Sequence, residues 1–216
     1  MTPVAPETQS PQAVSVWYIR HGENPANLTG ELSCRKVDYP LTGHGIEQAQ
    51  ALAARLASGS EPVPAAIYAS PLRRAAQTAR ILASRLAVPV HTLEELRELD
   101  VGDLEGRRDE QAWKLYLDVA YAWHAGEHDR AYPGGEDFHR VLARLRAALG
   151  RALDHPPGSR VFMVAHDGLI RAALPALCPG IAPPATGLPK CGIARFLASK
   201  TPGGPEFALL DWPEPG

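Results

Sequence analysis

The chain has 216 residues, of which 45% are hydrophobic and 21% are charged, and its formal net charge is -2. This composition is ordinary for a globular protein, and the near-neutral charge excludes a general attraction to nucleic acid or to an anionic membrane. No apolar run reaches the roughly 18 residues of a membrane span, and the three cysteines, which lack CxxC spacing, disfavour a disulfide framework or a zinc knuckle.

The first half of the chain alternates predicted strands with predicted helices. Residues 1–13, rich in Pro, Gln, Ser and Thr, are expected to form a disordered leader that lacks a signal-peptide pattern. Strands are predicted over residues 14–19, 65–69 and 88–93, and helices over residues 41–58 and 70–86. Thr42 is placed to cap the first helix, and Ser70 followed by Pro71 is typical of the start of the second.

The second half continues the same alternation after a charged loop over residues 94–108. Two helices are predicted, over residues 109–125 and 137–153, with a Pro-Gly-Gly turn between them. We expect the region from about residue 107 to 136 to form a lid or insertion. The remaining predicted elements are a strand at 160–165, a helix at 169–177 and closing strands at 191–198 and 207–212.

This alternation predicts an α/β fold: a three-layer sandwich with a mostly parallel central sheet flanked by helices, and a helical insertion over the active site. We expect one domain over residues 14–216. Ligands of such sheets bind beyond the carboxyl ends of the strands. Because residues 20–23 and 166–168 follow two of the predicted strands, His21 and His166 should meet at one edge of the sheet.

The pair Arg20 and His21 is suited to phosphoryl chemistry. A neutral imidazole is nucleophilic, and a guanidinium group binds phosphoryl oxygens through two parallel hydrogen bonds. Nearby positive charge also keeps the imidazole neutral. A lone histidine after a strand is more often structural, but four further features strengthen the functional reading.

The first of these features is the pair Arg73 and Arg74 near a helix N-terminus, where free amides and the dipole attract anions. One of the two should face the phosphate. The other features are His166 at a strand end, Glu98 in a loop where it can donate a proton, and Asn27 in a segment that can fold back over His21.

These segments resemble the histidine phosphatase superfamily, also called the phosphoglycerate mutase-like family, from Val16 to about Ala173. Five stretches carry the resemblance: residues 20–23 (RHGE), 38–45 (D-x-P-L-T-x-x-G), 70–79 (S-x-L-x-R-A-x-Q-T-A), 98–106 (E-x-x-x-G-x-x-E-G) and 164–168, which is similar to V-S-H-G-G. The third stretch selects Arg74 over Arg73 as the phosphate ligand.

The resemblance implies a role for each matching residue. His21 would attack phosphorus, while Arg20, Arg74, Asn27 and His166 hold the phosphoryl oxygens. Glu98 would act first as proton donor and then as base, and His166 would be the second histidine of the catalytic pocket. The family's chemistry implies no metal and no cofactor. The expected partner is a small phosphorylated metabolite, with no nucleic acid and no membrane; the expected location is the cytoplasm, and a homodimer is left open.

Two features favour a phosphatase over a mutase. Arg97 precedes Glu98 where the glycolytic mutases carry asparagine, and the mixed segment at 109–130 follows Arg107 and Arg108 in place of a basic anion-gripping insertion. Residues 133–136 also resemble the P-G-G-E-S segment of the broad-specificity and α-ribazole phosphatase branch. The alternatives are a 2,3-bisphosphoglycerate-dependent phosphoglycerate mutase and a non-catalytic module that binds phosphorylated ligands.

The chain departs from the family pattern at Asn24 (usually Ser or Thr), Arg35 (often Gly) and Asp167 (the first Gly of H-G-G). None of these departures removes a catalytic group. Glu23 and Glu105 are expected to support loops. The aromatic residues of the insertion are expected to pack in the core, and if the middle region forms the lid some of them would contact the leaving group: Trp113, Tyr116, Tyr121 and Trp123. The arginines of the following helix are expected to form a solvated face: Arg140, Arg144, Arg146 and Arg151.

Overall fold

A single six-stranded sheet runs through the part of the chain that the computed structural model describes, residues 13–59, 61–181 and 186–213. The strands are β1 (Ala13–Arg20), β2 (Ala66–Ala69), β3 (Val90–Thr92), β4 (Arg160–Ala165), β5 (Ile193–Thr201) and β6 (Gly204–Asp211), in the order β3-β2-β4-β1-β5-β6. The first four in that order are parallel, whereas β5 is antiparallel to both β1 and β6. The predicted α/β fold with a mostly parallel sheet is confirmed. Residues 1–12 of the predicted leader lie outside the described residues, and Ala13 already belongs to β1.

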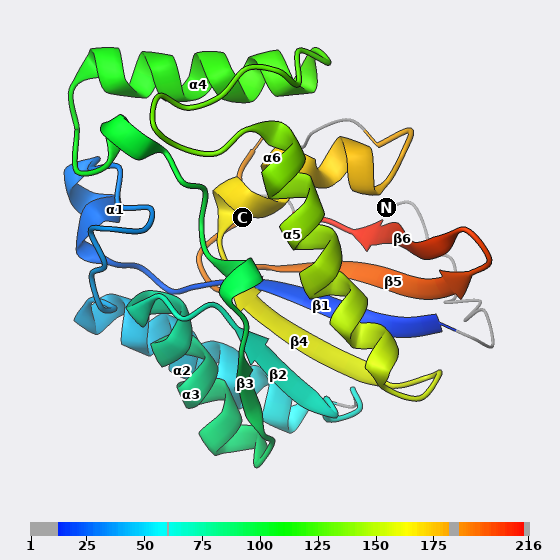
Figure 1. Ribbon diagram of the computed structural model, residues 1–216. Helices are drawn as coiled ribbons and strands as arrows, with labels where there is room; N and C mark the ends of the chain where they lie inside the picture. The colour runs from blue at the N-terminus through cyan, green and yellow to red at the C-terminus, as the bar shows by residue number, and fades with distance from the viewer. Residues whose placement is uncertain (1–12, 60, 182–185, 214–216) are drawn as a thin grey trace, which may run out of the picture.

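Helices cover both faces of this sheet (Figure 1). They are α1 (Pro25–Thr29), α2 (Gly43–Ser58), α3 (Arg73–Leu86), α4 (Glu110–His124), α5 (Phe138–Gly150) and α6 (Asp167–Leu177), with short 3-10 turns at Glu94–Leu96, Gly102–Leu104 and Arg151–Asp154. Helices α2 and α3 pack on one face, and α5 and α6 pack on the other. The result is the three-layer sandwich expected from the sequence.

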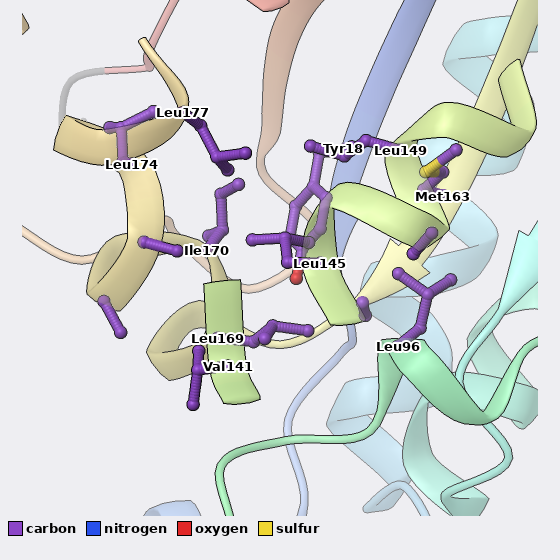
Figure 2. Close-up of a cluster of buried hydrophobic side chains, with 14 of the residues drawn as sticks. Tyr18, Leu96, Val141, Leu145, Leu149, Met163, Leu169, Ile170, Leu174 and Leu177 are labelled. Carbon is purple, nitrogen blue, oxygen red and sulfur yellow. The ribbon is translucent and has the colours of Figure 1, made fainter. Parts of the chain in front are cut away.

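Strand β1 shows why both faces need cover. Its buried side chains alternate: Trp17 and Ile19 join the apolar cluster under α2 and α3, while Val16 and Tyr18 join the larger cluster under α5 and α6. Figure 2 shows that second cluster, with Tyr18 surrounded by leucines of α5 and α6. A strand buried on both faces becomes a rigid support for whatever follows its carboxyl end.

Polar side chains cap the start of three helices, one of them, Thr42, as the sequence predicts. Thr42, Asp109 and Asp137 each accept a hydrogen bond from the backbone amide three residues later. The helix predicted from Ser70 instead begins at Arg73, and it has no side-chain cap because its N-cap residue is Leu72, an apolar side chain. The Ser70 hydroxyl accepts from the Leu72 amide and contacts the His166 ring. The segment after His21, predicted as a loop, contains the short helix α1.

Parallel pairing of β1 with β4 sets the position of the site. Arg20 lies opposite Ala165 in the register, so the next residues, His21 and His166, leave the sheet side by side. Their ring centroids are 5.2 Å apart. The expectation that the two histidines meet at one edge of the sheet is therefore confirmed. No helix in the described part of the chain is long and apolar enough to cross a membrane.

Candidate active site

The His21 ring is held in one orientation and one tautomer. It is only 4% exposed, and its Nδ1 lies 2.6 Å from the carbonyl oxygen of Gly22, to which it must donate. Nε2 is therefore the unprotonated nitrogen. Burial, followed by the charges of Arg74 and Arg20, lowers the His21 pKa well below its usual 6.5, so the ring is neutral at physiological pH.

Arg74 brings a buried positive charge against this nitrogen. The side chain leaves the first residues of α3 and is 2% exposed, and its Nε donates to His21 Nε2 over 3.2 Å. Nη2 donates to the carbonyl of Cys34, while Nη1 is buried, lies 3.7 Å from the Asp38 carboxylate and has no hydrogen-bond partner among the described residues. A buried guanidinium with an unused donor is ready to bind an anion.

His166 lies beside His21 and is fully buried. Its Nε2 lies 2.9 Å from the hydroxyl of Ser70, and its Nδ1 has no partner among the described residues. The Tyr18 hydroxyl donates to the His166 carbonyl over 2.8 Å, which fixes the backbone at this point. Burial and the charge of Arg74 lower the His166 pKa well below its usual 6.5.

Glu98 reaches the same site from the loop that follows β3. Its carboxylate accepts hydrogen bonds from the amides of Leu99 (2.9 Å) and Gly168 (3.2 Å), the latter in the first turn of α6. A Cβ atom on Gly168 would stand 2.9 Å from Glu98 Oε1, so only glycine leaves room for this carboxylate. Burial raises the Glu98 pKa above its usual 4.5, which favours the protonated form that can donate to a leaving group.

The two remaining predicted ligands come from the segment around His21. Arg20 donates from Nη1 to the carbonyl of Leu188 and lies 3.8 Å from Asp167. Asn27, exposed on α1, accepts from the Asn24 amide through Oδ1. The Asn27 side chain therefore faces the site from a capped helix turn rather than from an irregular loop.

These residues surround a cavity of about 220 Å³. Arg20, His21, Asn27, Arg74 and Glu98 all line it, and the buried His166 ring adjoins His21. Helix α4, within the region predicted as a lid, contributes Trp113, Tyr116 and Leu117 to the lining. Core packing is confirmed for Trp123, which is 2% exposed, and is wrong for Tyr121, which is 64% exposed. Trp113 and Tyr116 pack against the core cluster and also line the cavity.

Each departure from the family pattern has a structural role. Asn24 caps α1, a role that asparagine fills as well as serine or threonine. Asp167 accepts from the Leu188 amide over 2.6 Å and faces both Arg20 and Arg171. Arg35 donates from Nε to the Glu98 carbonyl over 2.8 Å.

Sequence reasoning missed several supporting residues. Ser70, interpreted as a helix cap, orients His166. The Thr78 hydroxyl accepts from the Gly22 amide and so ties α3 to the loop of His21. Glu105, by contrast, supports a loop as the sequence predicts, because it accepts from the amides of Cys34, Arg35 and Val37.

Comparison with known proteins agrees with this geometry. The sequence model of the histidine phosphatase superfamily (branch 1) matches residues 16–198. The chain belongs to this superfamily. It is therefore an enzyme of the histidine phosphatase type, a phosphoric monoester hydrolase.

Named relatives include both phosphatases and mutases. The metal-independent phosphoserine phosphatase of Arabidopsis thaliana is 32% identical over 74% of this chain and 67% of its own length. The probable phosphoglycerate mutase GpmB of Proteus mirabilis is 33% identical over 88% of this chain and 87% of its own. Among solved structures, a mycobacterial glucosyl-3-phosphoglycerate phosphatase superposes with a TM-score of 0.73 at 28% identity, covering 93% of this chain and 99% of that one.

Proposed function

We propose that this histidine phosphatase superfamily member is a metal-independent phosphomonoesterase that hydrolyses small phosphorylated metabolites through a phosphohistidine on His21. The supporting observation is the fixed tautomer of His21. Because Nδ1 donates to Gly22, the lone pair of Nε2 faces Arg74 at the cavity wall. A nucleophilic nitrogen with a guanidinium beside it is what in-line attack on a phosphoryl group needs.

In the first step His21 Nε2 attacks phosphorus and forms an N–P bond while the ester P–O bond breaks. The departing oxygen takes the electron pair of that bond and a proton from Glu98. Arg20, Arg74, Asn27 and His166 stabilise the charge on the three remaining phosphoryl oxygens. The free Nη1 of Arg74 and the free Nδ1 of His166 are the polar atoms that such an anion would satisfy.

In the second step Glu98, now ionised, takes a proton from water, and the water oxygen attacks phosphorus. The N–P bond breaks, its electron pair returns to Nε2, and inorganic phosphate leaves. One carboxyl group therefore serves as acid and then as base, which its raised pKa allows.

The cavity supports a small substrate. Its volume of about 220 Å³ lies below the roughly 300 Å³ at which drug-sized ligand sites begin. Beyond His21 and Glu98 the wall includes Trp113, Tyr116 and Arg171. A phosphate group and a short alcohol fill such a space. The cytoplasmic location and a homodimer stay predictions.

A phosphoglycerate mutase is the second candidate, and the relationship to GpmB over 88% of the chain favours keeping it. A mutase returns the phosphoryl group to a bound hydroxyl acid instead of to water. The same His21 and Glu98 would take part, so only the products distinguish the two activities.

The proposal is tested with a panel of small phosphomonoesters in the presence of EDTA, comparing the wild type with His21→Ala and Glu98→Gln. The panel includes 3-phosphoglycerate, with and without 2,3-bisphosphoglycerate. Chelator-resistant phosphate release that His21→Ala abolishes supports the phosphatase. Isomerisation without net release indicates the mutase, and neither activity across the panel indicates a module that only binds phosphorylated ligands.

A further inference from the structure

The backbone carbonyl of Glu98 accepts hydrogen bonds from two arginines of distant segments. Arg35 Nε donates over 2.8 Å, and Arg144 Nη2 donates over 3.1 Å. Arg144 comes from α5, on the face of the sheet that α6 also covers. Two charged donors on one carbonyl are more than a surface loop needs to satisfy its backbone.

Glu136 joins these two arginines. Its Oε1 accepts from Arg35 Nη2 and from Arg144 Nε, each over 2.8 Å. Its Oε2 accepts from Arg144 Nη2 over 2.9 Å and from the Asp100 amide over 3.0 Å. Glu136 is only 7% exposed, so this network is shielded from water, where charge-assisted hydrogen bonds are stronger.

The contacts extend along the whole acid-bearing loop. Arg144 Nη1 also donates to the carbonyls of Glu95 and Arg97, and the Glu136 amide donates to the Asp100 carbonyl over 2.8 Å. A Cβ atom on Gly135 would stand 2.2 Å from that same carbonyl oxygen. Close packing of the Pro-Gly-Gly-Glu turn on this loop therefore requires glycine.

The same network reaches the phosphate side of the cavity. The Arg35 amide donates to Glu105, and the preceding residue, Cys34, accepts from Arg74 Nη2 over 3.3 Å. Arg35 thus lies between the backbone of Glu98 and the segment that contacts the guanidinium of Arg74. A displacement of Arg35 would change the position of the acid relative to the nucleophile.

We propose that Arg35, Glu136 and Arg144 are positioning residues that hold Glu98 at the distance from His21 at which it protonates the leaving group. This inference rests on the proposed phosphatase function. None of the three residues lines the cavity; they act through the backbone of the loop that carries Glu98, Arg35 and Arg144 at the Glu98 carbonyl and Glu136 at Asp100. Arg144 does not lie on a solvated helix face as its sequence pattern predicts: its side chain is 13% exposed and hydrogen-bonded at every nitrogen.

If these residues position Glu98, their substitution should affect the rates of two kinds of substrate differently. An alkyl phosphate releases a strongly basic alkoxide and needs the proton of Glu98, whereas p-nitrophenyl phosphate releases a stabilised phenolate and does not. Misplacement of a catalytic group by about 1 Å costs on the order of 10²-fold in rate. We call the set Arg35, Glu136 and Arg144 the clamp. Substitutions in the clamp should therefore slow phosphorylation of His21 by alkyl esters but not by the nitrophenyl ester.

The test uses Arg144→Lys and Arg35→Gln, with Arg140→Lys as the matched control. Arg140 lies on the same helix, is 73% exposed at its side chain, and contacts only Asp137 through that side chain among the described residues. For the best alkyl phosphate of the panel, we expect kcat to fall about 10- to 100-fold in both clamp variants, with KM changed less than about twofold. The nitrophenol burst, which reports phosphorylation of His21, should stay within about threefold of wild type, and Arg140→Lys should match wild type throughout.

Equal losses on the alkyl ester and in the nitrophenol burst would overturn the inference, since they indicate general damage to the fold, and so would unchanged alkyl ester kinetics. Either result with an active wild type leaves the proposed function standing. A wild type without His21-dependent phosphate release contradicts the proposed function itself. Amide hydrogen exchange gives a readout independent of activity: Arg144→Lys should speed exchange at Asp100, and unchanged protection there would contradict the clamp.

Discussion

Arg74 Nε lies 3.2 Å from His21 Nε2 and donates a hydrogen bond to it. Arg74, which we assign to phosphate binding, therefore donates to the same lone pair of His21 that we assign to attack on phosphorus. An incoming phosphoryl group must take over this donor, after which the lone pair is free and the charge of Arg74 serves the phosphoryl oxygens. Binding of the substrate and activation of the nucleophile are consequently coupled at one side chain.

The first prediction concerns this pair. Arg74→Lys keeps the charge but removes the planar fork, so the phosphoryl oxygens lose at least one donor. We expect kcat/KM to fall by roughly 10²- to 10³-fold, as for the loss of one oxyanion donor elsewhere. Steady-state kinetics on the best panel substrate measures it. A loss below about threefold would show that Arg74 does not bind the transferred group.

The second prediction is the pH dependence of kcat/KM. His21 must be neutral, so activity rises as pH increases through its pKa, which burial and the two arginines place below 6.5. Glu98 must be protonated, so activity falls as pH increases through its pKa, which burial places above 4.5. We expect an optimum on the acid side of neutrality.

Glu98→Gln provides the control for this profile. The variant should lose about 10²- to 10⁴-fold in rate on alkyl esters, and the alkaline limb that belongs to Glu98 should disappear. Ionisation of the substrate contributes equally to both profiles and cancels in the comparison. An alkaline limb that is unchanged in Glu98→Gln would assign it to another group.

The third prediction concerns the departure at Asp167. Its carboxylate lies 3.8 Å from Arg20 and 3.7 Å from Arg171, so it offsets positive charge at the cavity wall. Asp167→Asn keeps an oxygen for the Leu188 amide but removes the negative charge. We expect orthovanadate to inhibit the variant about fivefold more strongly than the wild type, equivalent to about 1 kcal/mol. The Glu98 pKa should decrease in the variant, because the charge of Asp167 raises it in the wild type. Weaker inhibition would mean that Asp167 orders Arg20 for binding instead of competing with the anion.

The fourth prediction separates two glycines in the first turn of α2. A Cβ atom on Gly45 would stand 2.1 Å from the Glu23 carbonyl oxygen, whereas one on Gly43 would meet nothing within 4 Å. Gly45→Ala should therefore destabilise the protein by more than about 2 kcal/mol. Gly43→Ala should be neutral or stabilise it by up to about 1 kcal/mol, because alanine favours helix. Chemical denaturation of both variants checks the difference, and similar free energies of unfolding would contradict the close approach of α2 to Glu23.

Local patterns predicted the elements that place the site. The apolar run before His21 and the one before His166 each form a strand, and the parallel pairing of these strands places the two histidines side by side at the sheet edge. Helix α1 escaped prediction because five residues are too few to show a period. Its local signals are the cap residue Asn24, the proline that follows and the C-terminal Gly30.

Contacts between distant segments could not be predicted. Ser70 reads equally well as a helix cap and as a partner of His166, and only the fold decides between them. Arg144 shows the regular spacing of its helix, but its partners Glu98 and Glu136 lie in other segments. Charged residues on a helix are usually solvated, so the exception becomes visible only when the loop that it binds is in place.

The central claim, a covalent intermediate on Nε2 of His21, is tested most directly by trapping it. The wild type and His21→Ala are mixed with a ³²P-labelled alkyl phosphate and quenched with alkali, which preserves phosphohistidine, and the labelled site is located by mass spectrometry and NMR. We predict one labelled residue, His21, phosphorylated at Nε2, and no label in His21→Ala. Turnover with no trapped label in any quench, or label at Nδ1 or on another residue, would contradict the mechanism.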